Sequence, residues 1–271
     1  MKSLVRKTLR YATVALVLVL AVAYLSQLPD ESVMNAKEIN PSLHRTVAVF
    51  GGSGTAGDGV LKAVLADPKV EKVHIVTRRT TPRMEEGVAS GKAVITTHMD
   101  YLDYSAMSDV LQEVYAVYWA LGTSARNVSK EQYGVIHVDF PLAFVEAWLD
   151  AADVENRSFH YISGAGTSAK SSMHWAREKA RAEQSLSART EGTGLKVISY
   201  RPPYIAPTTE QSGFGPNLLH AVFSPIKQSL RATEIGQSML EVTARGDEVA
   251  DGAVLESKVI RAYSEAYLGR E

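Results

Sequence analysis

The segment Gly51-Gly-Ser-Gly54-Thr-Ala-Gly57 has the residue types and the spacing needed to bind a pyrophosphate. It directly follows residues 47–50, which are β-branched or apolar and typical of a buried parallel strand. Glycines allow the backbone to approach a phosphate closely, and the free N–H groups and positive dipole end of the next helix attract the anion. The segment therefore predicts a dinucleotide-binding turn between a strand and a helix.

The residues after this turn support the same interpretation, which a bare glycine spacing alone would not. Residues 58–66 place four apolar side chains on one helical face: Val60, Leu61, Val64 and Leu65. Asp67-Pro68 ends this helix, and residues 73–77 form a second predicted strand at βαβ spacing. Asp58 is discordant, because a carboxylate near a phosphate repels it unless the side chain turns outward.

Strand and helix patterns alternate along the rest of the chain. Residues 92–97, 116–121, 158–162 and 196–200 are predicted strands, and residues 106–115, 133–152 and about 172–188 are predicted helices. This alternation predicts an α/β fold with a doubly wound parallel sheet of the Rossmann type. A small C-terminal, substrate-side region is expected from about residue 204: a loop at 206–225, a helix at 233–243 with Thr233 as N-cap and Gly246 after its end, a strand at 253–255 and a helix at 257–268.

The first 28 residues are predicted to form a separate hydrophobic helix that serves as a membrane anchor or a signal segment. Lys2, Arg6, Lys7 and Arg10 precede the uncharged residues 11–25, and residues 9–28 reach the roughly 20 residues of a span if Arg10 snorkels. We favour a single N-terminal membrane anchor. The alternatives are an exported chain whose signal is cleaved, for which Ala21-Val-Ala23 has the small-x-small pattern, and a buried core helix.

An anchor of this kind raises a question of orientation. Positive charge ahead of a span favours an inside N-terminus, which would send the following domain away from the cytosolic pool of nicotinamide cofactor. A mitochondrial outer-membrane signal anchor, or a failure of translocation for other reasons, would resolve this conflict, and the sequence does not decide between them. Residues 29–44 are expected to be a linker, and residues 45–271 a single dinucleotide-binding domain.

Composition excludes several other classes of protein. The chain has 271 residues, of which 45% are hydrophobic, so it can bury a sizeable core. Its formal charge of −1 becomes about −5 without the basic N-terminal segment, which argues against a nucleic-acid partner. Cysteine is absent, and the seven histidines show no metal-binding spacing, so no metal site is expected.

The ordered set GGSGTAG, TRR, ALGT, FHYISG, a lysine in the next helix and RPPYI resembles the short-chain dehydrogenase/reductase superfamily. It looks closest to the extended or atypical branch, which includes NmrA-like proteins and the Tat-interacting tumour-suppressor group. The resemblance covers about residues 46–268. Each motif is weak by itself, whereas their order and spacing together are specific.

The resemblance implies where the cofactor binds. The phosphates would lie at Gly51, Gly54 and Gly57, with Ser53 and Thr55 as extra donors, the adenine at Asp100 and Tyr101, and the adenosine ribose at Leu121 and Gly122. Arg78 and Arg79 stand at the end of the second strand, where an acid would bind both ribose hydroxyls of NAD(H). Guanidinium groups suit a 2′-phosphate, so NADP(H) is preferred and NAD(H) is the alternative.

The active-site motif departs from the family. The family's chemistry uses a serine to hold the substrate oxygen, a tyrosine to transfer the proton, and a lysine to lower the pKa of that tyrosine and hold the nicotinamide ribose. Ser163 and Lys179 take the serine and lysine places, but Trp175 stands where the tyrosine should be. An indole N–H is not a practical acid or base near neutral pH. His174 and Tyr204 are the candidate substitutes, although His174 is expected to face elsewhere.

Two functions are compatible with this pattern. The first is an NADP-dependent oxidoreductase or epimerase relative that acts on a small carbonyl, alcohol or sugar-like substrate with a non-standard proton donor. The second is a non-catalytic, membrane-tethered NADP(H)-binding protein whose bound nucleotide regulates a protein partner. Trp175 favours the second function, and the otherwise complete set of motifs favours the first.

Overall fold

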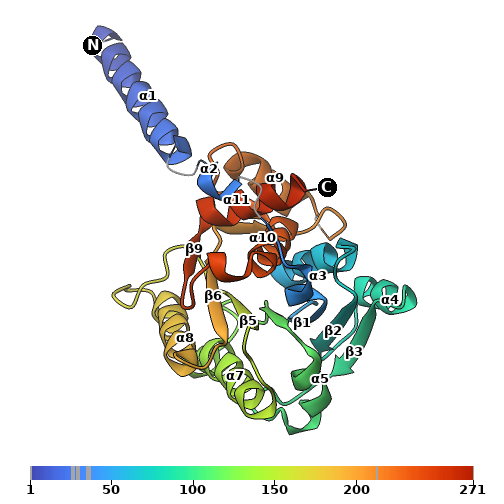
Figure 1. Cartoon of the computed structure of the whole chain (residues 1–271). Coiled ribbons are helices and arrows are strands. Elements are labelled where there is room, and N and C mark those ends of the chain that lie inside the picture. Colours follow the sequence, from blue (N-terminus) through green and yellow to red (C-terminus); the bar gives the residue numbers. More distant parts are fainter. Residues whose placement is uncertain (1, 26–27, 29–30, 35–37, 212, 271) are drawn as a thin grey trace.

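The fold is an α/β sandwich built on one parallel sheet (Figure 1). The structure is a computed structural model that describes residues 2–25, 28, 31–34, 38–211 and 213–270. The sheet strands are β1 (Thr46–Phe50), β2 (Lys72–Thr77), β3 (Ala93–Thr97), β4 (Ala116–Trp119), β5 (Ser158–Ile162), β6 (Lys196–Arg201) and β9 (Val254–Glu256). Their order is β3-β2-β1-β4-β5-β6-β9, and every neighbouring pair is parallel. The predicted doubly wound Rossmann-type sheet is therefore confirmed.

Helices cover both faces of this sheet and bury two apolar clusters. The first face carries α3 (Thr55–Ala66), α10 (Ala232–Ala244) and α11 (Ser257–Leu268), with α4 (Pro82–Ala89) beside α3. The second face carries α5 (Ser108–Glu113), α7 (Phe140–Ala151) and α8 (His174–Thr190). The short 3₁₀ turn η2 (Ser105–Met107) directly precedes α5.

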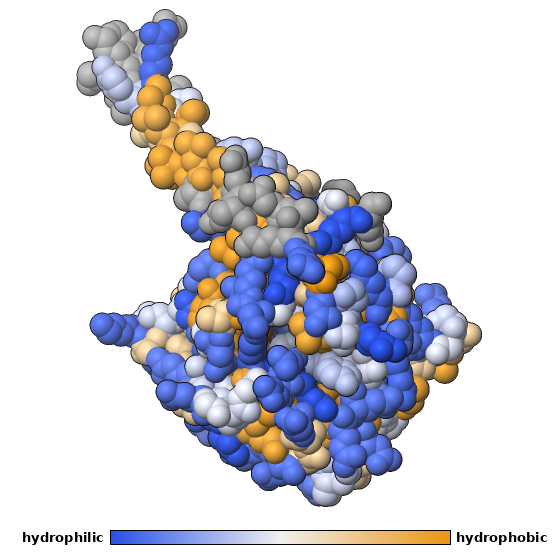
Figure 2. Space-filling model, in the orientation of Figure 1, coloured by the Kyte–Doolittle hydropathy of each residue, from blue (hydrophilic) through white to orange (hydrophobic). Residues whose placement is uncertain are grey.

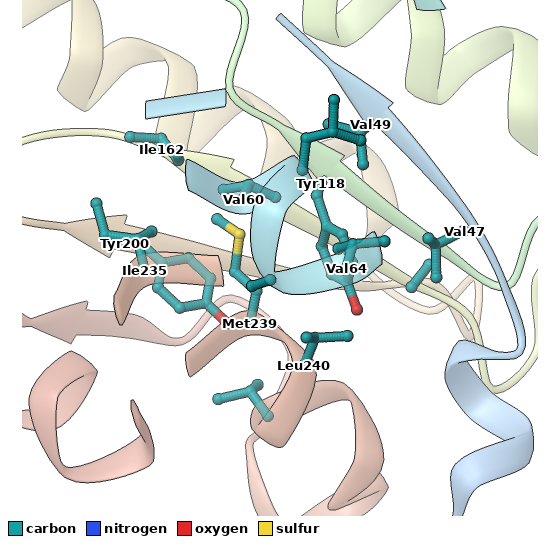
Figure 3. Close-up of a cluster of buried hydrophobic side chains, with 14 of the residues drawn as sticks. Val47, Val49, Val60, Val64, Tyr118, Ile162, Tyr200, Ile235, Met239 and Leu240 are labelled. Carbon is teal, nitrogen blue, oxygen red and sulfur yellow. The ribbon is translucent and has the colours of Figure 1, made fainter. Parts of the chain in front are cut away.

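Alternation along the strands assigns their side chains to the two clusters. Val47 and Val49 of β1 point into the first cluster, which Figure 3 shows with Val60, Met239 and Leu240. Their neighbours Ala48 and Phe50 belong to the second cluster. Because both faces of the sheet are covered, the strands read as continuous apolar runs in the sequence.

The long helix predicted for residues 133–152 is interrupted in the structure. It runs as α6 (Lys130–Gly134), a π-helical turn η3 (Val135–Asp139) and then α7. Pro141 has no N–H to donate to the carbonyl oxygen of His137, and that oxygen instead accepts the Tyr161 hydroxyl at 2.9 Å. Such π turns arise where the ordinary helical hydrogen bonds cannot all be made, and they are frequent at functional sites.

The substrate-side region contains more regular structure than the sequence predicts. The expected loop at 206–225 is wrong in part, because α9 (Phe214–Phe223) lies within it, next to a small parallel sheet of β7 (Tyr204–Ala206) and β8 (Ser229–Arg231). The expected N-cap is also wrong: Thr233 is inside α10, and Arg231 is the N-cap. A 3₁₀ turn η4 (Gly246–Glu248) follows α10.

The membrane anchor predicted for residues 9–28 is not supported by the described residues, and residues 26 and 27 of that segment lie outside them. Within the described ranges, no helix combines the length and the apolar character needed to cross a membrane. Helix α1 spans Lys2–Leu25, and its residues from Tyr11 onward are uncharged. Figure 2 shows the apolar band along this part of α1, in which Val14, Leu18 and Val22 are exposed.

The segment between α1 and β1 is only partly described. It contains α2 (Glu31–Met34) and the 3₁₀ turn η1 (Pro41–His44), and Val33 packs against the first apolar cluster. Residues 29, 30 and 35–37 of the predicted linker lie outside the described residues. The linker and domain boundaries, and the alternative of a cleaved export signal, stay predictions.

Candidate dinucleotide and catalytic site

The glycine turn lies between β1 and α3, at the point where the strand order reverses between β1 and β4. Gly51 has φ +76°, and a side chain there would approach the backbone nitrogen of Leu121 to 2.5 Å. A Cβ on Gly57 would overlap the carbonyl oxygen of Gly51. Both positions therefore require glycine for the turn itself, and ligands of open α/β sheets bind beside such a reversal point.

Gly54 differs from these two glycines because its surroundings are open. It has φ −95°, is exposed, and a Cβ there would meet only the Gly51 oxygen at 3.4 Å. Its N–H donates to the Gly51 carbonyl at 2.9 Å, and it is the N-cap of α3. Because Gly54 has no side chain, the space in front of the N-terminus of α3 stays open, and this terminus attracts anions.

Asp58 is buried and its charge is paired with Arg83, which lessens its repulsion of a phosphate at the turn. Its carboxylate accepts two hydrogen bonds from the Arg83 guanidinium, at 2.8 Å and 3.2 Å, and one from the Thr208 hydroxyl at 2.7 Å. Asp58 and Thr208 are each 1% exposed. Arg83 neutralises the charge of the Asp58 carboxylate, and the hydrogen bond from Thr208 joins α3 to the substrate-side segment.

Two cavities meet at the carboxyl edge of the sheet and form one groove. One has a volume of about 560 Å³ and the other about 440 Å³, and they share four lining residues: Gly54, Ala120, Leu121 and Gly122. The first cavity reaches Ser163, Trp175 and Lys179. The second reaches Thr77, Arg78, Arg79 and Tyr101. The groove therefore brings together most of the residues that the sequence predicts to bind cofactor.

In the second cavity, which also contains Gly51 and Ser53, the two arginines are placed to bind an anion. Arg78 and Arg79 are exposed, and within the described part of the chain neither guanidinium has an ion pair. Arg78 lies over the Tyr101 ring at 6.0 Å from its centroid. Asp100, which the sequence predicts to contact the adenine, does not line either cavity. Its carboxylate accepts a hydrogen bond from the backbone N–H of Leu102 at 3.0 Å.

The first cavity, which Thr55 also lines, contains a buried lysine. Lys179 is 7% exposed, donates to the carbonyl oxygen of Ile162 at 2.7 Å and lies 4.6 Å from the Tyr161 ring centroid. Burial lowers the pKa of Lys179 to about 7, and the nearby Glu183 opposes this effect. The Ser163 hydroxyl lies 3.1 Å from that of Thr167. A serine hydroxyl and an amine of lowered pKa thus face one cavity.

Trp175 lines the same cavity, but its polar atom is engaged elsewhere. Its indole N–H donates to the Met173 sulfur at 3.3 Å, and its ring covers Gly164 and Gly166. His174, one position earlier, does not line the cavity, and its Nε2 lies 3.2 Å from the Lys130 carbonyl oxygen. Neither side chain is placed to transfer a proton in this cavity.

Two further cavity residues, Tyr133 and His137, come from the interrupted helix and were missed by the sequence reasoning. They are 4% and 3% exposed, and their rings pack 4.1 Å apart between centroids. Burial and the Lys179 charge lower the pKa of His137 to about 3, so its imidazole is neutral. A signal was available in the sequence: Pro141 inside a helical pattern implies a break next to these residues.

A larger cavity, of about 880 Å³, lies at the opposite, amino edge of the sheet, but its cations already have partners. Arg157 donates to three backbone carbonyl groups, Lys196 pairs with Asp247, and Arg245 pairs with Glu241 and Glu248. Its charged groups are therefore committed to holding the fold, and the carboxyl-edge groove is the candidate site.

Comparisons with other sequences give weak but consistent similarity. No protein-family model matches the chain. The leucinostatins biosynthesis cluster protein T of Purpureocillium lilacinum is 26% identical over 139 residues, which are 51% of this chain and 50% of that protein. The mitochondrial protein fmp52 of Emericella nidulans is 26% identical over 170 residues, or 61% of this chain and 69% of that protein. The chain thus spans only about half the length of the first of these relatives.

Comparisons with solved structures establish the fold. A 3-oxoacyl-[acyl-carrier protein] reductase from Brucella melitensis superposes with a TM-score of 0.60 at 17% identity, covering 82% of this chain and 96% of that one. The RhlG/NADP active-site complex of Pseudomonas aeruginosa superposes with a TM-score of 0.62 at 17% identity, covering 78% and 94%. At such low identity these structures define a Rossmann-type fold shared with dehydrogenases and reductases.

Proposed function

We propose that this protein binds NADP(H) in the carboxyl-edge groove and is an oxidoreductase of the short-chain dehydrogenase/reductase type. The observation that carries this proposal is the glycine turn at the strand-order reversal, where Gly51 and Gly57 have no room for a side chain and Gly54 leaves the helix terminus open. The substrate class is a small carbonyl, alcohol or sugar-like compound. The whole ordered set of motifs, from GGSGTAG to RPPYI, favours the atypical branch that includes NmrA-like proteins.

The residues of the groove fit a phosphorylated dinucleotide. The N–H groups at the start of α3 would hold the diphosphate, and Arg78 and Arg79 would hold the 2′-phosphate. Lys179 would bind the ribose next to the nicotinamide, and Ser163 the substrate oxygen. When bound, the nicotinamide supplies or accepts a hydride. NAD(H) is the alternative cofactor, and it would leave the two guanidinium groups without a phosphate partner.

A second function is favoured by Trp175. Because its N–H donates to Met173, the residue in the family's tyrosine place offers neither a proton nor a hydroxyl to a substrate. The protein would then bind NADP(H) without turnover and signal the redox state of the cofactor to a protein partner.

Hydride-transfer assays distinguish these functions. We expect slow, NADPH-dependent reduction of at least one compound in a panel of aldehydes, ketones and quinones. The loss of NADPH absorbance measures the rate. Trp175→Tyr should raise the rate, because a phenol one helical turn before Lys179 faces the same cavity. Tight NADPH binding with no reduction in either protein would favour the non-catalytic function.

A further inference from the structure

The substrate end of the groove has a phenol that the family motif does not account for. Tyr133 and Tyr204 are the two tyrosines that line the cavity with Ser163 and Lys179. Tyr133 as a whole is 4% exposed, and within the described residues its hydroxyl makes no hydrogen bond and is not among the fully buried unpaired atoms. The hydroxyl of this cavity-lining tyrosine therefore remains accessible, and a ligand in the cavity can supply its hydrogen-bond partner.

The local structure fixes the Tyr133 ring. Helix α6 begins with a capping box, in which Ser129 accepts from the Gln132 backbone N–H and Gln132 accepts from that of Ser129. One turn later the ring packs on His137, which is itself anchored to Thr123 through Nε2. Tyr133 is therefore held more rigidly than Tyr204, which is half-buried on the two-stranded β7–β8 sheet.

A ring contact places Tyr133 beside the first turn of α8. Its ring lies 6.0 Å from that of His174, between centroids, and the charge of Glu178, the residue before Lys179, contributes to raising the pKa of the Tyr133 phenol. The interrupted helix and α8 thus present Tyr133 and Lys179 to one space.

We propose that Tyr133 donates the proton to the substrate oxygen, in place of the phenol that Trp175 has displaced. This inference rests on the proposed oxidoreductase function. NADPH, when bound, would supply the hydride for the new C–H bond at the carbonyl carbon; the C=O π electrons would move to oxygen, and Tyr133 would give that oxygen its hydroxyl proton. The resulting phenolate recovers a proton from water at the open mouth of the cavity.

The Tyr133 phenol carries the proton that this step requires. Burial and the Glu178 carboxylate raise the pKa of Tyr133 to about 12, so the phenol stays protonated at ordinary pH. It can therefore donate a proton to the more basic alkoxide oxygen of a carbonyl that is being reduced.

The test uses the full chain, with Tyr133→Phe, the rival Tyr204→Phe, and Tyr115→Phe as a control at the opposite edge of the sheet. For the best carbonyl substrate of the panel, Tyr133→Phe should lower kcat/KM by about 10²- to 10⁴-fold. The wild type should show a solvent deuterium isotope effect, and the residual activity of Tyr133→Phe should lose it. The double variant Tyr133→Phe with Trp175→Tyr should react at least tenfold faster than Tyr133→Phe alone, because Trp175→Tyr supplies another phenol.

Binding measurements separate a chemical role from a structural one. NADPH affinity and the melting temperature should be unchanged in Tyr133→Phe. Binding of the same carbonyl compound to the NADP⁺-loaded protein, where no hydride is available, should weaken about three- to tenfold for the loss of one hydrogen bond. The inference is overturned if Tyr204→Phe rather than Tyr133→Phe gives these losses, or if the wild type binds NADPH but reduces no carbonyl. Absence of NADPH binding would instead overturn the proposed function itself.

Discussion

Arg83 donates to both carboxylate oxygens of Asp58, at 2.8 Å and 3.2 Å. The same carboxylate accepts the Thr208 hydroxyl, and Arg83 reaches on to Glu210 at 3.4 Å. One buried acid thus links the helix of the glycine turn to the segment that borders the substrate cavity. Its charge is neutralised where it would otherwise repel a bound phosphate.

Asp58→Asn should destabilise the protein by about 1–3 kcal/mol, because it weakens buried, charge-assisted hydrogen bonds to Arg83 and Thr208. Urea denaturation measures this free energy of unfolding. Glu210→Gln is the matched control: its carboxylate also contacts Arg83 but is exposed, so its loss should change stability by less than about 0.5 kcal/mol. Equal effects of the two variants would contradict a special role for the buried acid.

Gly57→Ala and Gly54→Ala should separate folding from binding. A methyl group on Gly57 overlaps the Gly51 carbonyl, so this variant should lose about 1–3 kcal/mol of stability together with NADPH affinity. On Gly54 the methyl group has room in the protein but occupies the approach of the diphosphate, so affinity should fall at least tenfold with little change in stability. Normal NADPH affinity in Gly54→Ala would contradict the proposal that the diphosphate binds at this turn.

The double variant Arg78→Ala with Arg79→Ala should weaken NADPH binding at least tenfold more than NADH binding, since only NADPH carries the 2′-phosphate. Arg45→Ala is the control, because Arg45 pairs with Glu71 at the other edge of the sheet. Calorimetric titration of both nucleotides gives the comparison. Parallel losses for NADPH and NADH would rule out the assigned 2′-phosphate contact.

The stability of the cofactor-free protein should rise with pH above neutrality because of Lys179. Burial lowers its pKa to about 7, whereas in the unfolded chain its pKa is near 10.5. Between these values the unfolded chain holds a proton that the folded protein does not, so raising the pH favours folding, by at most about 1.4 kcal/mol per pH unit. Denaturation of wild type and Lys179→Met at pH 7.5 and 9.0 tests this: the wild type should gain more. An identical pH dependence would show that Lys179 is not buried in its neutral form.

The sheet and the glycine turn could be predicted because their signals are local. Strands buried on both faces are continuous apolar runs, and β5 begins and ends where the pattern predicts, at Ser158 and Ile162. Gly51 and Gly57 are diagnostic because no other residue fits their backbone contacts.

The substrate side could not be predicted because its structure depends on tertiary contacts. The Gly- and Pro-rich start of α9 reads as a loop, yet Pro216 lies in the first helical turn, where its missing N–H costs nothing. Tyr133 reads as an ordinary apolar position of a helix. Pro141 signals the helix break that follows Tyr133, but the packing of α6 against α8, which brings Tyr133 to the cavity, is a tertiary contact that no local pattern encodes.

The proposal that a phosphorylated nicotinamide dinucleotide occupies the groove is tested most directly by isothermal titration of NADPH into the purified full chain. We expect saturable binding of one NADPH per chain, tighter than the binding of NADH under the same conditions. Heats no larger than dilution for both nucleotides would contradict the account.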